Sequence, residues 1–429
     1  MPVMMTRAAP AAAIAISTGL AAGQPRFIPL GFGDQSRPSS VAAAISGDGR
    51  SVTGTTSFPA PENSNGFLWN EIDGLRSIGR IQGLPAEFLR PRAISFDGSV
   101  IAGGGAQEVP FRWSATGGPT ELAALTGVTG GYFVDAVSGD GTIIGGSFES
   151  RDLGVTLPLI WTQAGATVET LPDLPGGDAD AGIFSIDKTG AVISGYASDI
   201  AGPRAAVWFD RTGPAVLAGT PILVGSIVVR HVTLDGSSFA GDVWPDLDFP
   251  LSRYAFVWTS VGGFVPIRDG SGFPVQAETA GISDGANFVA GNGRFSADGD
   301  FEGWLWDLWR GARPIRQVLA VENDLDITGW TDLRLVGISH DGSRIAGNGR
   351  DPAGRARAFV AEINAFGCNA ADTAAPLGVL SSADVDVFRD RFFAGDPRVA
   401  ALAEPLDVVS QSDIESFVAL FFQGCFSPE

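Results

Sequence analysis

The side chains of this sequence that could do chemistry are few and widely spaced. There are two histidines, His231 and His340, and each lies in a repeated segment where other copies carry Ala, Gly or Phe. A Ser-His-Asp triad or a histidine-rich metal site needs histidine beside suitable partners. The sequence also has no Cys/His zinc spacing, no phosphate-binding glycine loop and no dinucleotide fingerprint. We therefore interpret both histidines as ordinary residues at the edges of turns.

Carboxylates are the remaining candidates, because two acids are enough for glycoside hydrolysis. Several occur in segments that we predict as longer loops: Asp178, Asp180, Asp246, Asp248, Asp298, Asp300 and Glu302. Two interpretations stay open: these acids coordinate a cation or act on a sugar, or they are solvated loop residues. Five other aspartates recur at one position of a repeat, where turn formation explains them: Asp48, Asp97, Asp140, Asp235 and Asp341.

A sevenfold repeat predicts the elements that position these groups. Each copy has a small or apolar pair, Ser or Thr, a variable residue, Asp-Gly, a short apolar run and a closing Gly. Aspartates of successive copies are 49, 43, 47, 48, 49 and 57 residues apart, with Asp187 taken for the fourth copy. This period is typical of β-propeller blades. The copies span Ala44–Gly54, Ala93–Gly103, Ala136–Gly145, Phe184–Gly195, His231–Gly241, Gly281–Gly291 and Gly337–Gly347.

Asp-Gly between two apolar runs predicts a hairpin, because Gly adopts positive φ without steric cost. The hydroxyl before it can bond to the turn backbone, and the closing Gly suggests the end or a bend of the second strand. A third strand carrying Trp and a short fourth strand follow. The third-strand positions are Trp69, Trp113, Trp161, Trp208, Trp258 and Trp306, with Ala361 in the seventh copy.

The seventh copy lacks a fourth strand, whereas Phe27–Gly31 looks like a fourth strand with no unit before it. In a closed ring such a strand completes the last blade, and closure removes the exposed sheet edge. We therefore predict an all-β fold over residues 24–365, a seven-bladed β-propeller closed by an N-terminal strand. The tryptophans in register should pack between blades. The candidates for exposed stacking on carbohydrate are Trp244, Trp304, Trp309 and Trp330.

These repeats resemble the HAF-type repeats of bacterial extracellular proteins. The resemblance rests on the Ser-x-Asp-Gly turn, the closing Gly and the Phe-x-Trp strand, and it covers roughly residues 25–363. It implies a fold and no particular reaction.

Composition and the N-terminus indicate export. Residues 1–23 carry Arg7, a short Ala/Ile-rich run and a final Ala21-Ala22-Gly23, which predict a secretory signal peptide. The run is too short to span a bilayer, and no longer apolar run occurs, so we expect no integral membrane span. The net charge of −20 without a basic cluster argues against nucleic acid as a partner. We expect a secreted bacterial protein, extracellular or at the cell surface.

Residues 366–429 predict a separate module built from two copies of about 29 residues. Each copy ends in an amphipathic helix. One helix groups Val385, Phe388 and Phe392 on one face, and the other groups Ile414, Phe417, Val418 and Phe421. Cys368 and Cys425 bracket the module, and an even cysteine pair in an exported protein predicts a disulfide.

This module resembles the duplicated dockerin-type modules of bacterial secreted proteins, in the variant with Gly-Cys at both ends. The resemblance implies loops related to the EF-hand that bind calcium, and a partner that is a cohesin-like or other cell-surface protein. It assigns the calcium ligands to Asp372, Asp384, Glu404, Asp407 and Asp413. Ser381 and Ser410 precede two of these acids by three residues, so helix capping is the alternative interpretation of Asp384 and Asp413.

The leading functional hypothesis is a secreted, non-catalytic binding or scaffold protein with a C-terminal docking or anchoring module. A secreted polysaccharide-active enzyme with a dockerin-like tail is the alternative. A structural coat component that assembles with itself is a third.

Overall fold

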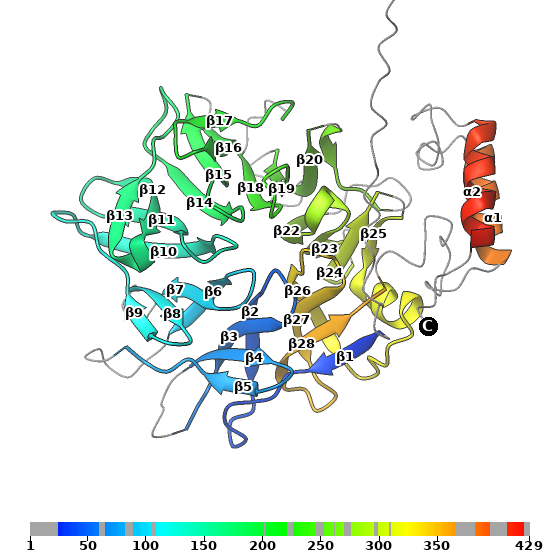
Figure 1. Cartoon of the computed structure of the whole chain (residues 1–429), viewed down its shortest axis with the longest axis horizontal. Helices are drawn as coiled ribbons and strands as arrows, with labels where there is room; N and C mark the ends of the chain where they lie inside the picture. The colour runs from blue at the N-terminus through cyan, green and yellow to red at the C-terminus, as the bar shows by residue number, and fades with distance from the viewer. Residues whose placement is uncertain are drawn as a thin grey trace, which may run out of the picture.

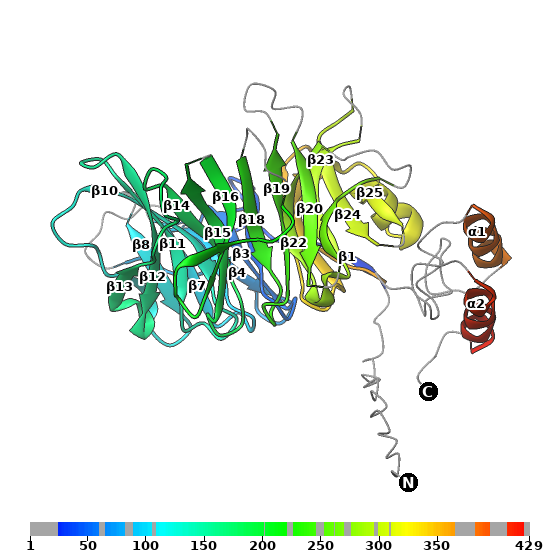
Figure 2. The same ribbon diagram turned by 90° about the horizontal axis from the view of Figure 1, so that it is seen from above.

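The computed structural model describes residues 25–59, 65–81, 89–104, 109–200, 202–220, 226–245, 253–260, 262–269, 276–295, 299–308, 310–364, 382–394 and 410–423. Within these ranges, seven four-stranded antiparallel sheets surround a central axis (Figure 1). The innermost strand of each sheet contacts the innermost strands of both neighbouring sheets, so the ring is closed. This confirms the predicted seven-bladed β-propeller, and Figure 2 shows the disc from its edge.

The first four blades each run outward from the axis in sequence order. Blade 1 contains β2 (Ser40–Ile45), β3 (Ser51–Thr56), β4 (Gly66–Asn70) and β5 (Gly74–Ser77). Blade 2 contains β6 (Arg90–Ile94), β7 (Val100–Gly104), β8 (Pro110–Ser114) and β9 (Gly118–Glu121). Blade 3 contains β10 (Gly130–Val137), β11 (Ile144–Ser150), β12 (Val155–Thr162) and β13 (Thr167–Thr170). Blade 4 contains β14 (Ala181–Ile186), β15 (Val192–Asp199), β16 (Gly202–Phe209) and β17 (Pro214–Val216).

Blades 5 to 7 complete the ring. Blade 5 contains β18 (Ser226–Val232), β19 (Ser238–Trp244), β20 (Tyr254–Thr259) and β21 (Gly263–Pro266). Blade 6 contains β22 (Gln276–Ile282), β23 (Val289–Arg294), β24 (Glu302–Asp307) and β25 (Gly311–Pro314). Blade 7 contains β26 (Thr331–Ile338), β27 (Arg344–Arg350), β28 (Ala356–Glu362) and β1 (Arg26–Pro29). Short helical turns are η1 (Gln163–Gly165), η3 (Asp284–Ala286) and the π-helical η4 (Gln317–Glu322).

The repeated turn joins the first two strands of each blade as the sequence predicts. In blade 1 the Ser46 hydroxyl donates to the Asp48 carboxylate at 2.6 Å and accepts the Ser51 N–H at 2.9 Å. Gly49 has a φ of 72°, which only Gly adopts at low cost. The same pair of hydroxyl bonds recurs in blades 2, 3, 5 and 7.

The fourth turn corrects the predicted alignment by two residues. Asp187, and not Ser185, takes the place of the turn serine, because its N–H donates to the Val192 carbonyl in the way that other turn serines bond. Its carboxylate accepts the N–H groups of Thr189 and Gly190, at 3.1 and 2.6 Å. An aspartate therefore does here by itself what a Ser and Asp pair does elsewhere.

A β-bulge in every innermost strand explains the closing glycines. In β2, Ala43 is left unpaired while its neighbours pair with β3. The bulge brings β2 so close to β3 that a Cβ on Gly54 would lie 2.1 Å from the Val41 carbonyl oxygen. Gly54 lies inside β3, so the expectation of a strand end or bend there is wrong. The bulge residues are Ala43, Arg92, Asp135, Phe184, Arg230, Ala280 and Val336.

In blade 3 the glycine opposite the bulge is Gly146, and not Gly145 as predicted. A Cβ on Gly146 would lie 1.9 Å from the Phe133 carbonyl oxygen. The double glycine of this copy made the two positions equivalent in sequence, and only the strand register separates them.

The N-terminal strand closes the ring as predicted. β1 pairs antiparallel with β28, placing Phe27 opposite Ala361 and Pro29 opposite Phe359. The Phe27 ring lies 5.0 Å from the rings of Trp330 and Phe359. The last blade therefore contains strands from both ends of the propeller sequence, and separating them would break one sheet.

Third-strand tryptophans link neighbouring blades. Trp161 and Trp208 are fully buried. Their indole N–H groups donate to the carbonyls of Ala123 and Pro172, which follow the last strand of the preceding blade, at 2.7 and 2.8 Å. Burial of the indole and satisfaction of its one donor make these residues core, as predicted.

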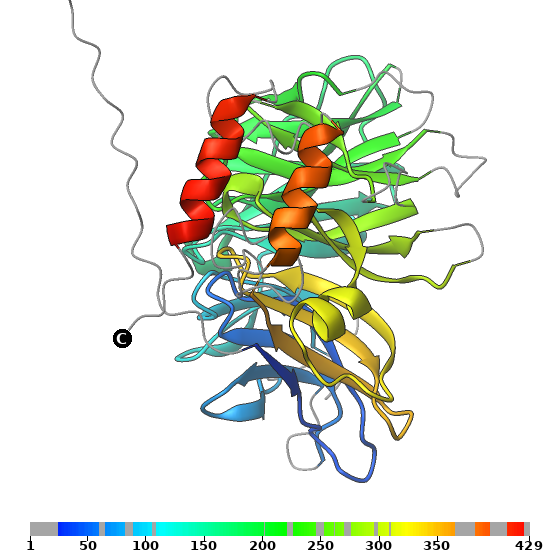
Figure 3. The ribbon, with the colours of Figure 1, turned by 90° about the vertical axis from the view of Figure 1, so that its right-hand side faces the viewer.

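Two helices form the described part of the C-terminal segment, α1 (Ser382–Phe393) and α2 (Gln411–Gln423), and they lie side by side (Figure 3). Phe388 and Phe417 stack with ring centroids 4.0 Å apart. Val385 and Ile414, which the sequence groups on the same helix faces as these phenylalanines, are 41% and 38% exposed. The signal peptide, Cys368 and Cys425 lie outside the described residues.

Candidate functional site

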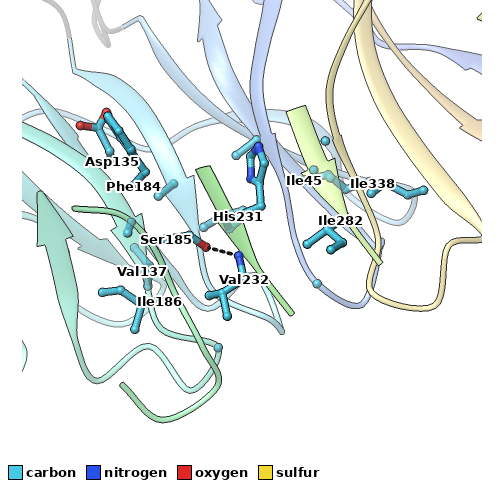
Figure 4. A pocket seen from close by; sticks show the side chains of 18 of the residues that line it. Ile45, Asp135, Val137, Phe184, Ser185, Ile186, His231, Val232, Ile282 and Ile338 are labelled. Atoms are coloured by element: carbon cyan, nitrogen blue, oxygen red, sulfur yellow. Dashed lines mark hydrogen bonds between the residues drawn. The ribbon is translucent and has the colours of Figure 1, made fainter. Parts of the chain in front are cut away.

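The central channel holds a cavity of about 270 Å³ that all seven blades line (Figure 4). Three rings of residues, each with one member per blade, surround the axis. The turn ring is Gly47, Phe96, Gly139, Lys188, Leu234, Asp284 and His340. The aliphatic ring is Ile45, Ile94, Val137, Ile186, Val232, Ile282 and Ile338. The bulge ring consists of the seven bulge residues named above.

Hydrogen bonds from blade to blade hold the turn ring together. The Phe96 N–H donates to the Gly139 carbonyl at 3.0 Å, and the Lys188 N–H donates to the Leu234 carbonyl at 3.0 Å. Each blade donates to the next one in sequence. At the junction of blades 5 and 6 the acceptor is a side chain, because the Leu234 N–H donates to Asp284 Oδ1 at 3.1 Å. The same Asp284 oxygen lies 2.9 Å from His340 Nδ1.

Side chains of the turn ring cover its glycines. The rings of Phe96 and His340 lie 5.7 Å apart, and both cover Gly47, whose Cβ, if present, would lie 2.4 Å from an atom of each. Leu234 covers Gly139 in the same way, with 2.7 Å to its Cδ1. The channel therefore has a floor at the turn ring, and the variable position of the repeat supplies it.

His231 occupies a position between blades where the other six have Ala44, Ala93, Ala136, Ser185, Gly281 and Gly337. Burial lowers the pKa of His231 to about 4, although a hydrogen bond with the Thr279 backbone favours the charged form. The imidazole is therefore neutral at pH 7. Its Nε2 atom is buried and has no hydrogen-bond partner among the described residues.

The bulge ring carries an ion pair at the end of the channel away from the floor. Arg92 Nη1 lies 3.5 Å from Asp135 Oδ1, and their side chains are 60% and 22% exposed. Burial raises the pKa of Asp135, and the charges of Arg92 and Arg230 oppose that rise. One strong hydrogen-bond donor and one strong acceptor therefore meet at the bulge-ring end of the channel, which we call the rim.

A buried carboxylate fixes a second charged group beside this rim. Asp242 is fully buried, and its Oδ2 accepts from Arg230 Nε at 2.8 Å and from Arg253 Nη2 at 3.0 Å. Its Oδ1 accepts the Thr279 N–H at 2.8 Å. The Arg253 guanidinium lies 4.4 Å above the ring of Trp244. Arg230 in β18 and Arg253 just before β20 thereby share one buried acid.

The loop acids named from the sequence are dispersed. Asp178 is exposed. Asp180 accepts the Tyr196 hydroxyl at 3.0 Å, and burial together with this negative charge raises the pKa of that tyrosine. In blade 6, burial raises the pKa of Glu302, and the charge of Asp300 adds to the effect. Asp246, Asp248 and Asp298 lie outside the described residues.

The tryptophans proposed for exposed stacking are mostly core. Trp304 is fully buried and Trp330 is 6% exposed, so their prediction as stacking residues is wrong. Trp304 packs in a cluster with residues of blade 5, and Trp330 packs against Phe27 and Phe359 of its own blade. Trp244 is partly exposed but lies beneath Arg253. Trp309 lies outside the described residues.

Of the predicted calcium ligands, the structure describes Asp384 and Asp413, both fully buried at the start of a helix. Asp413 Oδ2 accepts the Ser410 N–H at 2.8 Å and the Ser410 hydroxyl at 3.0 Å, and the first of these is the bond that the acidic residue of a capping box makes. Asp372, Glu404 and Asp407 lie outside the described residues. The described residues contain no group of three His, Cys, Asp or Glu side chains that could hold a metal ion.

Sequence reasoning missed the Arg230 and Asp242 pair, although a signal was present. Each residue interrupts an apolar strand, in Val229-Arg230 and in Gly241-Asp242-Val243. A charge inside a buried strand requires a partner of opposite sign. What the sequence lacked was the bulge that turns Arg230 toward Asp242.

No helix among the described residues is long and apolar enough to cross a membrane. No protein-family model matches the chain, and no curated protein matches it. Among solved structures, the chain is similar to U3-55K, with 14% identity and a TM-score of 0.46 over 80% of this chain and 100% of that one. It is similar to the RRP9 WD40 repeats, with 14% identity and 0.47 over 80% and 98%. It is also similar to the Cps50 (Swd1) β-propeller domain of Myceliophteria thermophila, with 10% identity and 0.48 over 79% and 100%.

Proposed function

We propose that this chain is an exported, non-catalytic binding and scaffold protein of the bacterial cell surface or its surroundings. Its propeller binds carbohydrate at the open end of the channel, and residues 366–429 form a docking or anchoring module. The observation that supports the binding role is the bulge ring, where Arg92 and Asp135 meet beside arginines that buried Asp242 holds in place. Convergent polar groups around a concave opening are the usual form of a ligand site.

The chemistry of this rim suits hydroxyl groups. A sugar hydroxyl both donates and accepts, and a guanidinium beside a carboxylate offers both complements. Arg92 is the more exposed member of its pair, so its donors are accessible from solvent. The aromatic rings of Trp244 and Phe301 lie beneath Arg253 and Arg334, at 4.4 and 4.5 Å, and restrict those guanidiniums further.

We infer the docking role of the tail from its duplicated helices and their exposed apolar residues. Val385 and Ile414 occupy equivalent positions of the two copies and are about two-fifths exposed. Phe393 is 81% exposed. Apolar side chains repeated on the outside of a small helix pair favour a protein partner, and the dockerin resemblance makes that partner a cohesin-like or other cell-surface protein.

Calcium in the tail stays a prediction. The described donors do not form a calcium site by themselves, since calcium takes six to eight oxygens and one Asp413 oxygen already receives two bonds from Ser410. Calorimetric titration of the full chain with calcium tests the assignment to Asp372, Asp384, Glu404, Asp407 and Asp413. If the wild-type chain gives binding heat and the Asp413→Ala variant does not, calcium ligation is supported. If the wild-type chain gives no heat, helix capping remains as the role of Asp413.

Binding of the purified chain to a panel of neutral and acidic polysaccharides tests the propeller's role. Arg92→Ala should lower affinity about tenfold, because a charge-assisted hydrogen bond contributes roughly 1.5 kcal/mol or more. Arg76→Ala is the matched control, since it removes a half-exposed arginine from outermost strand β5. Absence of binding across the panel, or equal affinities of both variants, contradicts the proposal.

A polysaccharide-active enzyme is the second candidate, and Glu302 is the observation that favours it. A carboxyl whose pKa is raised by burial can act as a general acid toward a glycosidic oxygen. Release of new reducing ends from the panel, abolished by Glu302→Gln, would establish this function in place of the first.

A further inference from the structure

The two ends of the channel differ in a way that limits what can bind. At one end the turn ring is joined by hydrogen bonds across the blade junctions, Phe96 and His340 meet over Gly47, and Leu234 covers Gly139. At the other end the bulge ring carries the charged pair of Arg92 and Asp135. A ligand therefore enters past the bulge ring and stops at the turn ring.

The space between the two rings is small. The cavity of about 270 Å³ lies just below the range of roughly 300–1,000 Å³ that small-molecule sites span. This is of the order of one sugar residue and too little for a folded-back chain. Its wall is the aliphatic ring, which can pack against the C–H faces of a sugar.

Polar side chains line the cavity beside the aliphatic ring. Asp135 and Arg92 line the cavity at the rim. The neutral imidazole of His231 also lines the cavity (Figure 4). Its Nε2 lone pair is buried and lacks a donor among the described residues. Since a buried acceptor without a donor is costly, a small rotation of the ring toward a ligand hydroxyl would be favourable.

We propose that the channel binds the end of a carbohydrate chain, with one terminal residue in the cavity and the rest of the chain crossing the bulge ring to solvent. This inference rests on the proposed carbohydrate-binding function and specifies its ligand. A chain interior does not fit, because a polymer has no exit through the closed turn ring.

Stoichiometry distinguishes an end from an interior. Titration of the full chain with oligosaccharides of increasing length, and with their parent polymers, should give one protein per chain end at every length. Affinity should level off once the chain is longer than the cavity. A polymer that binds many proteins along each chain overturns this inference and leaves carbohydrate binding intact. If no oligosaccharide or polymer binds, both proposals fail.

Filling the cavity gives a second readout that does not depend on chain length. Ile94 is a half-buried member of the aliphatic ring, so Ile94→Trp should lower affinity for chain ends at least tenfold. Ile72→Trp makes the same change at a site that is 95% exposed in the turn before β5 and should leave affinity unchanged. Near-UV circular dichroism of both variants verifies folding. Unchanged binding by a folded Ile94→Trp variant overturns the seating of the terminal residue in the cavity.

Discussion

The backbone N–H of His340 donates to the carbonyl of Gly47 at 2.8 Å and so joins the last blade to the first. The two residues are the variable positions of the seventh and first turns. Every other junction has a comparable bond, with a side chain acceptor only at Asp284. The repeat thus closes the ring twice, through strand β1 at the outer edge and through the turns at the axis.

Gly47→Ala should destabilise the propeller by about 1–3 kcal/mol, the usual cost of forcing an extra carbon into a packed site. The added Cβ would lie 2.4 Å from ring atoms of both Phe96 and His340. Urea denaturation measures the change in the free energy of unfolding. Gly213→Ala is the control, because a Cβ there meets nothing within 4 Å. Equal stability of the two variants would show that the centre of the turn ring has room.

Phe27→Ala should destabilise the propeller by about 2 kcal/mol or more. The loss should be smaller than for a fully buried phenylalanine, because the Phe27 ring is partly exposed. Phe27 is the residue of β1 that packs on Trp330 and Phe359. Thermal unfolding followed by tryptophan fluorescence is the suitable measurement, since Trp330 reports on this contact. Ile72→Ala, on the exposed turn, should leave the transition unchanged. If β1 contributes nothing to ring closure, the Phe27→Ala and Ile72→Ala variants will unfold at the same temperature.

Asp242→Ala should cost about 3–5 kcal/mol, because it leaves two guanidinium groups without their buried partner. Arg230 and Arg253 both bond to Asp242 Oδ2. The variant should also lose carbohydrate binding, since the bulge ring depends on Arg230. Asp332→Ala removes an exposed acid paired with Arg350 and should cost at most about 1 kcal/mol. Comparable losses in the two variants would contradict the structural importance of Asp242.

Sequence alone predicts the ring, its blade number and its closure, because each rests on short-range chemistry. The Asp-Gly turn, the tryptophan strand and the unpaired Phe27 segment each have a local pattern with one structural solution. The fourth turn failed because Asp187 replaces a Ser and Asp pair, so matching residue types selected the wrong register.

The site was less predictable because its members come together only through the bulges. Arg92, Asp135 and Arg230 belong to three different blades and share no motif. Trp304 and Trp330 were misassigned for other reasons. Trp304 takes the position of Phe67, Phe111 and Phe256 in the repeat, which is fully buried in those blades. Trp330 lies outside the repeat, and the pattern does not encode its contacts with Phe27 and Phe359.

His231 should make stability fall as the pH drops below neutrality. Its pKa is about 4 in the folded chain and 6.5 as the ordinary value. Between those values the unfolded chain binds a proton that the folded chain does not, so the free energy of unfolding decreases as pH falls from 6.5 to 4. The whole effect is about 3 kcal/mol, at 1.36 kcal/mol per pKa unit. His231→Ala places at this position the residue found at Ala44, Ala93 and Ala136, and it should remove this contribution. Urea denaturation of both proteins at pH 7 and pH 4 measures it: the wild-type chain should lose more stability on acidification than the variant, and equal losses would show that His231 takes up its proton in the folded state.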